Sequence, residues 1–173
     1  MVRMTGGAAI IKSLRKYGIN TIFGVPGVQL DYFFNALYDE RNAIRFIHNR
    51  HEQGSGYMAF GYAASSGKVG AYAVVPGPGL LNSSSALSTA YACNSPVLCI
   101  SGQVPSNRIN RNLGSHHEIN DQLSVLSKLT KWSDRINHPT EAPGIIETAF
   151  QQLRSGRIRP VGVEAAPDTL QSE

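Results

Sequence analysis

Short apolar runs alternate with longer amphipathic segments along the sequence, and this alternation constrains the fold more than any other feature. The six β-rich runs, of which the fifth is the weakest, lie at 21–25, 44–48, 71–75, 96–101, 131–136 and 161–165. An amphipathic helix that ends at Gly18 precedes the first run, and helical segments follow at 29–40, 52–66, 79–92, 120–128 and 141–155, the last of which ends at Gly156. Strands that alternate with helices of this length form βαβ units with parallel strands.

The predicted strands are continuously apolar rather than alternating, as a sheet covered on both faces requires. A chain of 173 residues fits one domain, which at this size buries roughly 70% of the surface exposed when unfolded. We therefore expect residues 1–173 to form a single three-layer, doubly wound α/β domain, with a mostly parallel six-stranded sheet and helices on both faces.

The chain carries little charge for a soluble domain. Charged residues make up 16% of it and hydrophobic residues 42%, whereas about 25% charged residues is typical. This shortage suggests that a partner subunit or further domains cover part of the surface. The net charge of +4 comes from scattered basic residues, without the basic stripe interleaved with aromatic residues that is typical of nucleic-acid binding, so we expect no nucleic-acid partner.

The cysteines and the N-terminal segment indicate a cytoplasmic setting. Cys93 and Cys99 lie six residues apart without a C-x-x-C motif, which favours reduced thiols. No stretch of the sequence is long and apolar enough to span a bilayer. The N-terminal segment also lacks the uninterrupted apolar core of a signal peptide.

Glycine- and proline-rich turns follow four of the predicted strands. They lie at 23–27, 48–54, 74–82 and 101–105, and such turns let a ligand approach the backbone closely. Ligands of open parallel sheets bind beyond the carboxyl ends of the strands, where the topology switches. These turns are therefore the candidate binding edge, and the long polar loop at 103–119 is a candidate functional segment.

Several familiar motifs are absent or incomplete. The PGPG segment at 76–79 lacks the spacing and the lysine of a phosphate loop, which favours a tight turn from strand to helix. His116 and His117 are adjacent and have no third ligand at metal-site spacing, so we expect no metal site in this chain. Ser83–Ser85 lack the G-x-S-x-G nucleophile elbow.

Glu52 is a lone acid at the predicted start of a helix whose next residues, 54–64, carry no charge. Aromatic and small residues would cover most of the circumference of this helix, so we expect it to be buried on more than one side. The acid is then either a plain helix-end charge that faces water or a carboxylate held in a partly dry pocket. The residues alone leave both alternatives open.

The combination of motifs is more specific than any one of them. FGVPG, RHEQG with MA.GYA, GPG..N and SGQVP, in this order, resemble the N-terminal pyrimidine-binding (PYR) domain of thiamine diphosphate enzymes. The resemblance is closest to the acetolactate synthase group and its decarboxylase-like and carboligase-like relatives, and it extends to RPVGVEAAPDTL at the end of the chain. It implies thiamine diphosphate as cofactor and a small 2-keto acid as substrate.

The resemblance also implies roles for individual residues. Glu52 would hydrogen-bond the N1′ nitrogen of the cofactor's aminopyrimidine and so activate it. The cofactor pocket would be lined by Val25, Pro26, Gly27, Val75, Pro78 and Asn82. His117 stands where acetolactate synthases often have a Gln beside the substrate, or it is an ordinary surface histidine. Gln103 is expected to support the loop rather than to touch the cofactor.

The chain departs from the resembled family in two respects. Phe60 replaces an Asp that is usual in this motif, which argues against a standard biosynthetic acetolactate synthase. The GDG motif of the diphosphate-binding (PP) domain, through which Mg²⁺ would be held, is absent. We therefore expect a PP domain or a second copy as partner, with this chain as a fragment or a separate subunit that is inactive alone. A non-catalytic dimerisation or regulatory module is the alternative, and a nucleotide-binding α/β domain is a third.

Overall fold

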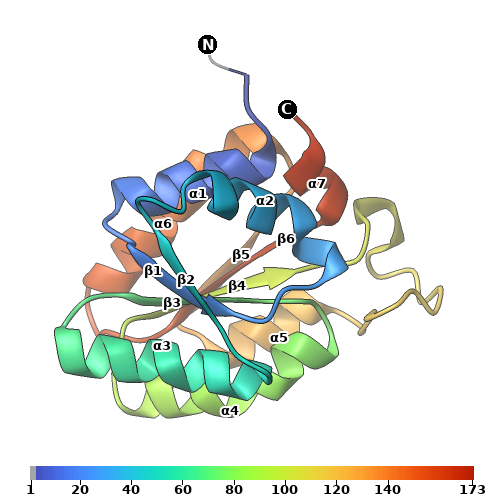
Figure 1. The fold of residues 1–173 in the computed structure, drawn as a ribbon. Helices are drawn as coiled ribbons and strands as arrows, with labels where there is room; N and C mark the ends of the chain where they lie inside the picture. The colour runs from blue at the N-terminus through green and yellow to red at the C-terminus, as the bar shows by residue number, and fades with distance from the viewer. Residues whose placement is uncertain (1–2) are drawn as a thin grey trace.

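A computed structural model describes residues 3–173 and contains one sheet of six parallel strands between two layers of helices (Figure 1). The strand order is β2-β1-β3-β4-β6-β5. The bounds in chain order are β1 Thr21–Gly24, β2 Arg45–His48, β3 Gly70–Val74, β4 Val97–Gly102, β5 Trp132–Ile136 and β6 Val161–Ala165. β3, β4 and β6 are buried along their whole length, whereas β2 and β5 form the partly exposed edges.

The helices divide between the two faces of the sheet (Figure 1). One face carries α1 Gly6–Lys16, α2 Asp31–Asp39 and α6 Ala142–Arg154, and the short α7 Pro167–Gln171 packs against α1 and α2. The other face carries α3 Glu52–Ser66, α4 Pro78–Ala92 and α5 Gln122–Leu129. The alternation of strand side chains separates the two cores: Ala71 and Ala73 belong to the first cluster, and Tyr72 and Val74 to the second.

The structure confirms the predicted three-layer α/β fold, and each predicted strand lies within one residue of an observed strand. The sheet is entirely parallel rather than mostly so. The helix expected over 29–40 begins only at Asp31, because the 3₁₀ turn Val28–Leu30 precedes it. α7 was missed, although Pro167 at its first turn is a typical helix-start signal.

The expectation that α3 is buried on more than one side is wrong for this chain. The buried residues of α3 are small, Ser55, Gly56, Ala59 and Ala63, and they face the sheet and α4. A Cβ atom on Gly56 would lie 2.6 Å from Cβ of Ala86 on α4, so this close helix contact excludes larger side chains. Among the larger side chains of α3, Phe60 and Tyr62 are partly buried against the core, whereas Tyr57 and Met58 are each 38% exposed.

Candidate functional site

The sheet has its topological switch point between β1 and β3. β1 pairs with β2 on one side and with β3 on the other, and the chain continues from β3 to β4 in the opposite direction. The turns after β1 and β3 therefore diverge and leave open space at the carboxyl edge, where ligands of such sheets bind. The residues at 25–27 and 75–79 lie at this edge.

Glu52 is the first residue of α3 and reaches the turn that follows β3. Its Oε2 atom accepts a hydrogen bond of 3.0 Å from Nδ2 of Asn82 on α4. Its Oε1 atom lies 3.6 Å from the position that a Cβ of Gly79 would take. Within residues 3–173, Oε1 accepts no hydrogen bond from a protein group. The half-buried carboxylate thus has one oxygen that is held in place and one that is open to a ligand.

Val75 lies between the two diverging turns and packs against both of them. A Cβ atom on Gly27 would lie 2.4 Å from Cγ1 of Val75, and one on Gly79 would lie 2.6 Å from Cγ2. The two glycines therefore allow both turns to close onto the buried valine. Pro26 and Pro78 are exposed at the rim, and Val25 is half-buried. The structure thus brings Gly27, Val75, Asn82 and Glu52 to one edge of the sheet.

Gly77 forms the turn between β3 and α4 in a conformation that favours glycine, with φ 59° and ψ −115°. A Cβ atom there would lie 2.3 Å from the carbonyl oxygen of His117, so the loop at 115–118 rests directly on this turn. The Gly77 N–H donates a hydrogen bond of 2.8 Å to Oε1 of Gln122. PGPG is therefore the strand-to-helix turn that the sequence predicts.

A buried polar network lies under this edge and was not predicted from the sequence. Glu164 of β6 is fully buried and forms an ion pair with Arg135 of β5. It also accepts hydrogen bonds of 2.8 Å from Gln122 and 3.3 Å from Gln103. The Gly77 turn is therefore connected through Gln122 to a buried carboxylate. One signal was available in the sequence, because Glu164 is a charged residue inside a strand of otherwise apolar residues.

His117 lies on the loop that covers the Gly77 turn. Its ring stacks on that of His116, with the centroids 4.0 Å apart, and its Nδ1 atom is buried without a hydrogen-bond partner in the described structure. Burial, and then the neighbouring His116, lower the pKa of His117 below its ordinary value of 6.5, while the charge of Glu52 acts in the opposite direction. His117 therefore lies within electrostatic range of Glu52.

The titration of His117 gives a direct check of this arrangement. Because its pKa is lower in the folded chain, the unfolded chain binds more protons just below pH 6.5. The contribution of His117 to the free energy of unfolding thus increases as pH rises through this window, and is lost as pH falls. In Glu52→Gln we expect a still lower pKa for His117, measured by NMR of the ring Cε1–H. An unchanged pKa would place Glu52 too far from His117.

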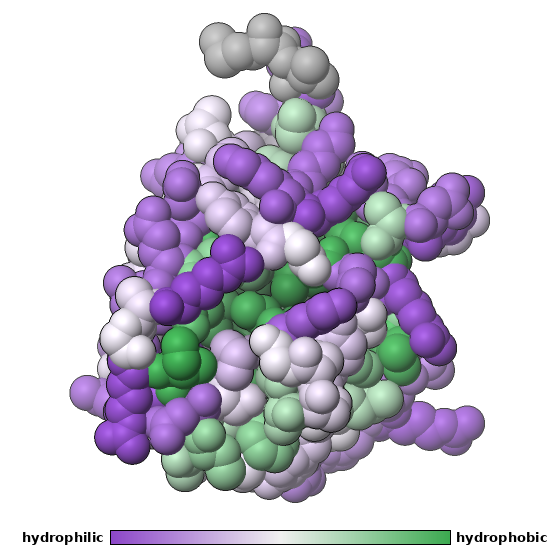
Figure 2. All heavy atoms as spheres, turned by 90° about the vertical axis from the view of Figure 1, so that its left-hand side faces the viewer, coloured by the Kyte–Doolittle hydropathy of each residue, from purple (hydrophilic) through white to green (hydrophobic). Residues whose placement is uncertain are grey.

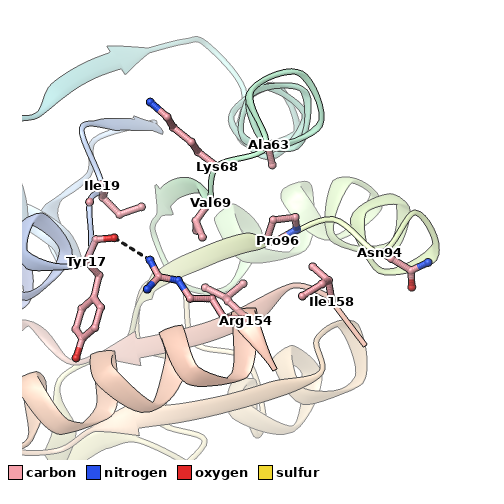
Figure 3. A pocket seen from close by; sticks show the side chains of 12 residues that line it. Tyr17, Ile19, Ala63, Lys68, Val69, Asn94, Pro96, Arg154 and Ile158 are labelled. Carbon is pink, nitrogen blue, oxygen red and sulfur yellow. Dashed lines mark hydrogen bonds between the residues drawn. The ribbon is translucent and has the colours of Figure 1, made fainter. Parts of the chain in front are cut away.

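A hollow of about 720 Å³ lies at the opposite edge of the sheet from Glu52. Its lining residues come from the connections that lead into β1, β3, β4 and β6 and from the C-terminal parts of α3 and α6. Figure 2 faces this edge and shows hydrophobic atoms on its floor, with hydrophilic side chains around them. In Figure 3, Arg154 spans part of the hollow and donates a hydrogen bond to the carbonyl oxygen of Tyr17. None of the candidate residues lines it.

The described residues hold no group of three or more His, Cys, Asp or Glu side chains that could bind a metal ion. We also find no helix in residues 3–173 with the length and apolar character needed to cross a membrane.

The fold defines a class of protein, a doubly wound parallel α/β domain, here with an acid at its topological switch point. The sequence profile described as "Thiamine pyrophosphate enzyme, N-terminal TPP binding domain" matches residues 4–125. The chain belongs to this family of thiamine pyrophosphate enzyme domains.

The chain is similar to several curated enzymes. A probable 2-ketoarginine decarboxylase, AruI, from Pseudomonas aeruginosa is 37% identical over 167 residues, which cover 96% of this chain and 30% of the relative. A probable acetolactate synthase large subunit from Methanocaldococcus jannaschii is 37% identical, with 98% and 28% covered. An acetolactate synthase from Arthrospira platensis is 38% identical, with 96% and 28% covered. The chain thus spans less than a third of the length of these relatives.

Proposed function

We propose that this chain is the pyrimidine-binding part of a thiamine diphosphate-dependent 2-keto-acid carboligase or decarboxylase, in which Glu52 activates the cofactor. One observation carries the proposal: the Glu52 carboxylate lies at the switch point, with Oε2 held by Asn82 and Oε1 open beside Gly79. A plain helix-end acid that faces water would not need the amide partner.

The residues at this edge fit a flat aromatic ring with a basic nitrogen. Gly27 and Gly79 let both turns pack closely on Val75, and this valine supplies an apolar floor. Asn82 orients the carboxylate, and Oε1 is free to share a proton with a ring nitrogen. When bound, thiamine diphosphate supplies a nucleophilic carbon and an electron sink for breaking or forming a bond beside a carbonyl group.

The chain alone accounts for only one end of such a cofactor. The described residues hold no acidic metal cluster, and the relatives are more than three times as long as the matched region. We propose that a PP domain, on a longer chain or on a partner, holds the diphosphate through Mg²⁺ and closes the site around a 2-keto acid. In this arrangement residues 1–173 are one PYR domain of a larger assembly.

The outward face of α3 and α4 is the proposed contact surface for this partner. The two helices pack side by side (Figure 1), and both begin at the candidate site. Their large exposed side chains are Tyr57, Met58 and Leu81. An uncharged surface next to Glu52 that packs against a second domain would also exclude water from the carboxylate.

Replacing Met58 with Asp tests this surface. We expect pairing with the PP domain to weaken at least about tenfold, because a buried interface would then contain an unpaired charge. The fold should remain intact, since Met58 is 38% exposed in this chain. Ser65→Asp introduces the same charge at an exposed position near the other end of α3, and is expected to leave pairing unchanged. Analytical ultracentrifugation measures both variants. Equal pairing of the Met58 variant and the wild type would rule out this surface.

Reconstitution tests the proposed function as a whole. Thiamine diphosphate and Mg²⁺ are titrated into the chain mixed with a PP domain, and decarboxylation of a 2-keto acid is followed. Turnover that requires both polypeptides supports the proposal. A non-catalytic dimerisation or regulatory module would give pairing without turnover, and a nucleotide-binding domain would give saturable binding of NAD or ATP to the isolated chain.

A further inference from the structure

A second, smaller hollow lies at the same edge of the sheet as Glu52 and has a volume of about 280 Å³. Three segments that are distant in the sequence build it: the 3₁₀ turn after β1, the loop after β4 and the start of α7. Its apolar walls come from Val28, Pro105 and Pro167. Walls of this kind suit an aromatic ring or a short aliphatic chain.

The polar end of this hollow contains two buried oxygen atoms that have no hydrogen-bond partner in the described structure. Gln29 is only 7% exposed, and its Nε2 atom donates a long hydrogen bond of 3.4 Å to the carbonyl oxygen of His116. Its Oε1 atom and the Oγ atom of Ser115 are buried without a hydrogen-bond partner within the described structure. Because buried polar atoms are almost always paired in folded proteins, the Gln29 amide oxygen indicates a missing group that donates a hydrogen bond. The Ser115 hydroxyl can either donate to such a group or accept from it.

The charge around the hollow limits what this group can be. Arg108 lines the hollow and forms no salt bridge with any carboxylate in residues 3–173. None of the residues that line the hollow is acidic. A cationic end group would therefore meet Arg108 without a counter-charge. A hydroxyl or carboxamide can donate to Gln29 and accept from Arg108 or Ser115.

Two series of neighbouring residues connect the hollow with the candidate site. Gln29 follows Gly27 by two residues, and Gly27 packs on Val75. His116 lines the hollow, and its ring stacks at 4.0 Å on that of His117. The carbonyl oxygen of His117 in turn lies against Gly77. The hollow therefore lies beside the same turns that surround the candidate site.

We propose that this hollow recognises the far end of the substrate, and that the substrate is a 2-keto acid whose apolar body ends in an uncharged hydroxyl or carboxamide group. The proposal rests on the proposed function, since it assigns a substrate class to that site. Gln29 and Ser115 are the residues that distinguish such an end group from a purely apolar one.

Binding of three probes to the isotope-labelled chain tests this assignment by NMR. The probes are 4-hydroxyphenylpyruvate, phenylpyruvate, which lacks the hydroxyl, and 5-guanidino-2-oxopentanoate, which ends in a cation. We expect saturable shifts of the amide signals at 28–29 and 115–116, with 4-hydroxyphenylpyruvate binding about tenfold more tightly than either other probe. Gln29→Met should remove this preference, and Ser115→Ala should reduce it. Gln151→Met, at an exposed position on α6, should retain it.

Equal affinity for the three probes, shifts that map elsewhere, or a preference that survives in both Gln29→Met and Ser115→Ala would overturn the assignment. Tighter binding of the guanidino probe would overturn it as well. Because these measurements need no cofactor and no turnover, they are independent of the test of Glu52. A preference for the hydroxyl together with full turnover by Glu52→Gln would retain the pocket and reject the proposed function.

Discussion

Turnover of a 2-keto acid by the reconstituted enzyme is expected to fall by about 100- to 10,000-fold when Glu52 is replaced with Gln, the range for loss of a positioned acid–base group. The substitution keeps the size of the side chain and leaves an oxygen that can accept the hydrogen bond from Asn82. It removes the negative charge and the capacity to share a proton with a ring nitrogen. Steady-state decarboxylation with saturating cofactor measures the effect.

Asp31→Asn is the matched control for this substitution. Asp31 is an exposed acid in the first turn of α2, as Glu52 is in the first turn of α3, but it lies among no candidate cofactor residues. Its replacement removes the same charge from the same helical position, and we expect turnover within about twofold of the wild type because a helix-end charge contributes only about 0.3–1 kcal/mol. If Glu52→Gln behaves like Asp31→Asn, then Glu52 is a plain helix-end acid and the proposed mechanism is wrong.

Replacing Glu164 with Ala is expected to lower the free energy of unfolding by about 3–5 kcal/mol, the range for removing one partner of a buried ion pair. Arg135 would lose its partner carboxylate, and Gln122 and Gln103 would each lose a buried acceptor. For a domain of this size, about 2–4 °C of melting temperature is lost per kcal/mol. The midpoint measured by circular dichroism should therefore fall by roughly 6–20 °C.

The exposed ion pair between Arg15 and Glu40 provides the comparison. It has a good distance of 2.8 Å, yet its side chains are 58% and 21% exposed, and such surface pairs contribute about 0–1 kcal/mol. Glu40→Ala should thus shift the midpoint by only a few degrees. Similar shifts for Glu40→Ala and Glu164→Ala would show that the buried network contributes little. In that case Gln122 would not need Glu164 to hold the Gly77 turn.

The elements and turns of this domain were accessible from the sequence because local patterns determine them. Short β-rich runs predicted all six strands, although the fifth run, 131–136, contains three charged residues, and the glycine and proline residues after four of them marked the candidate binding edge. The start of α3 at Glu52 followed from the same local signals. The sequence wrongly predicted that α3 is buried on more than one side within this chain. Uncharged residues indicate that a surface is covered, but they do not indicate whether the same chain or another one covers it.

The sequence by itself determined a doubly wound parallel sheet, the turns at its carboxyl edge and the acid at a helix start. Tertiary structure alone decided that β6 lies between β4 and β5, and that Gln122 therefore meets Glu164 from 42 residues away. It also brought Gln29 to His116 across 87 residues and so created the polar hollow. The physical reason is that backbone propensity acts over a few neighbouring residues, whereas contacts between distant side chains depend on how the sheet and its covering layers assemble.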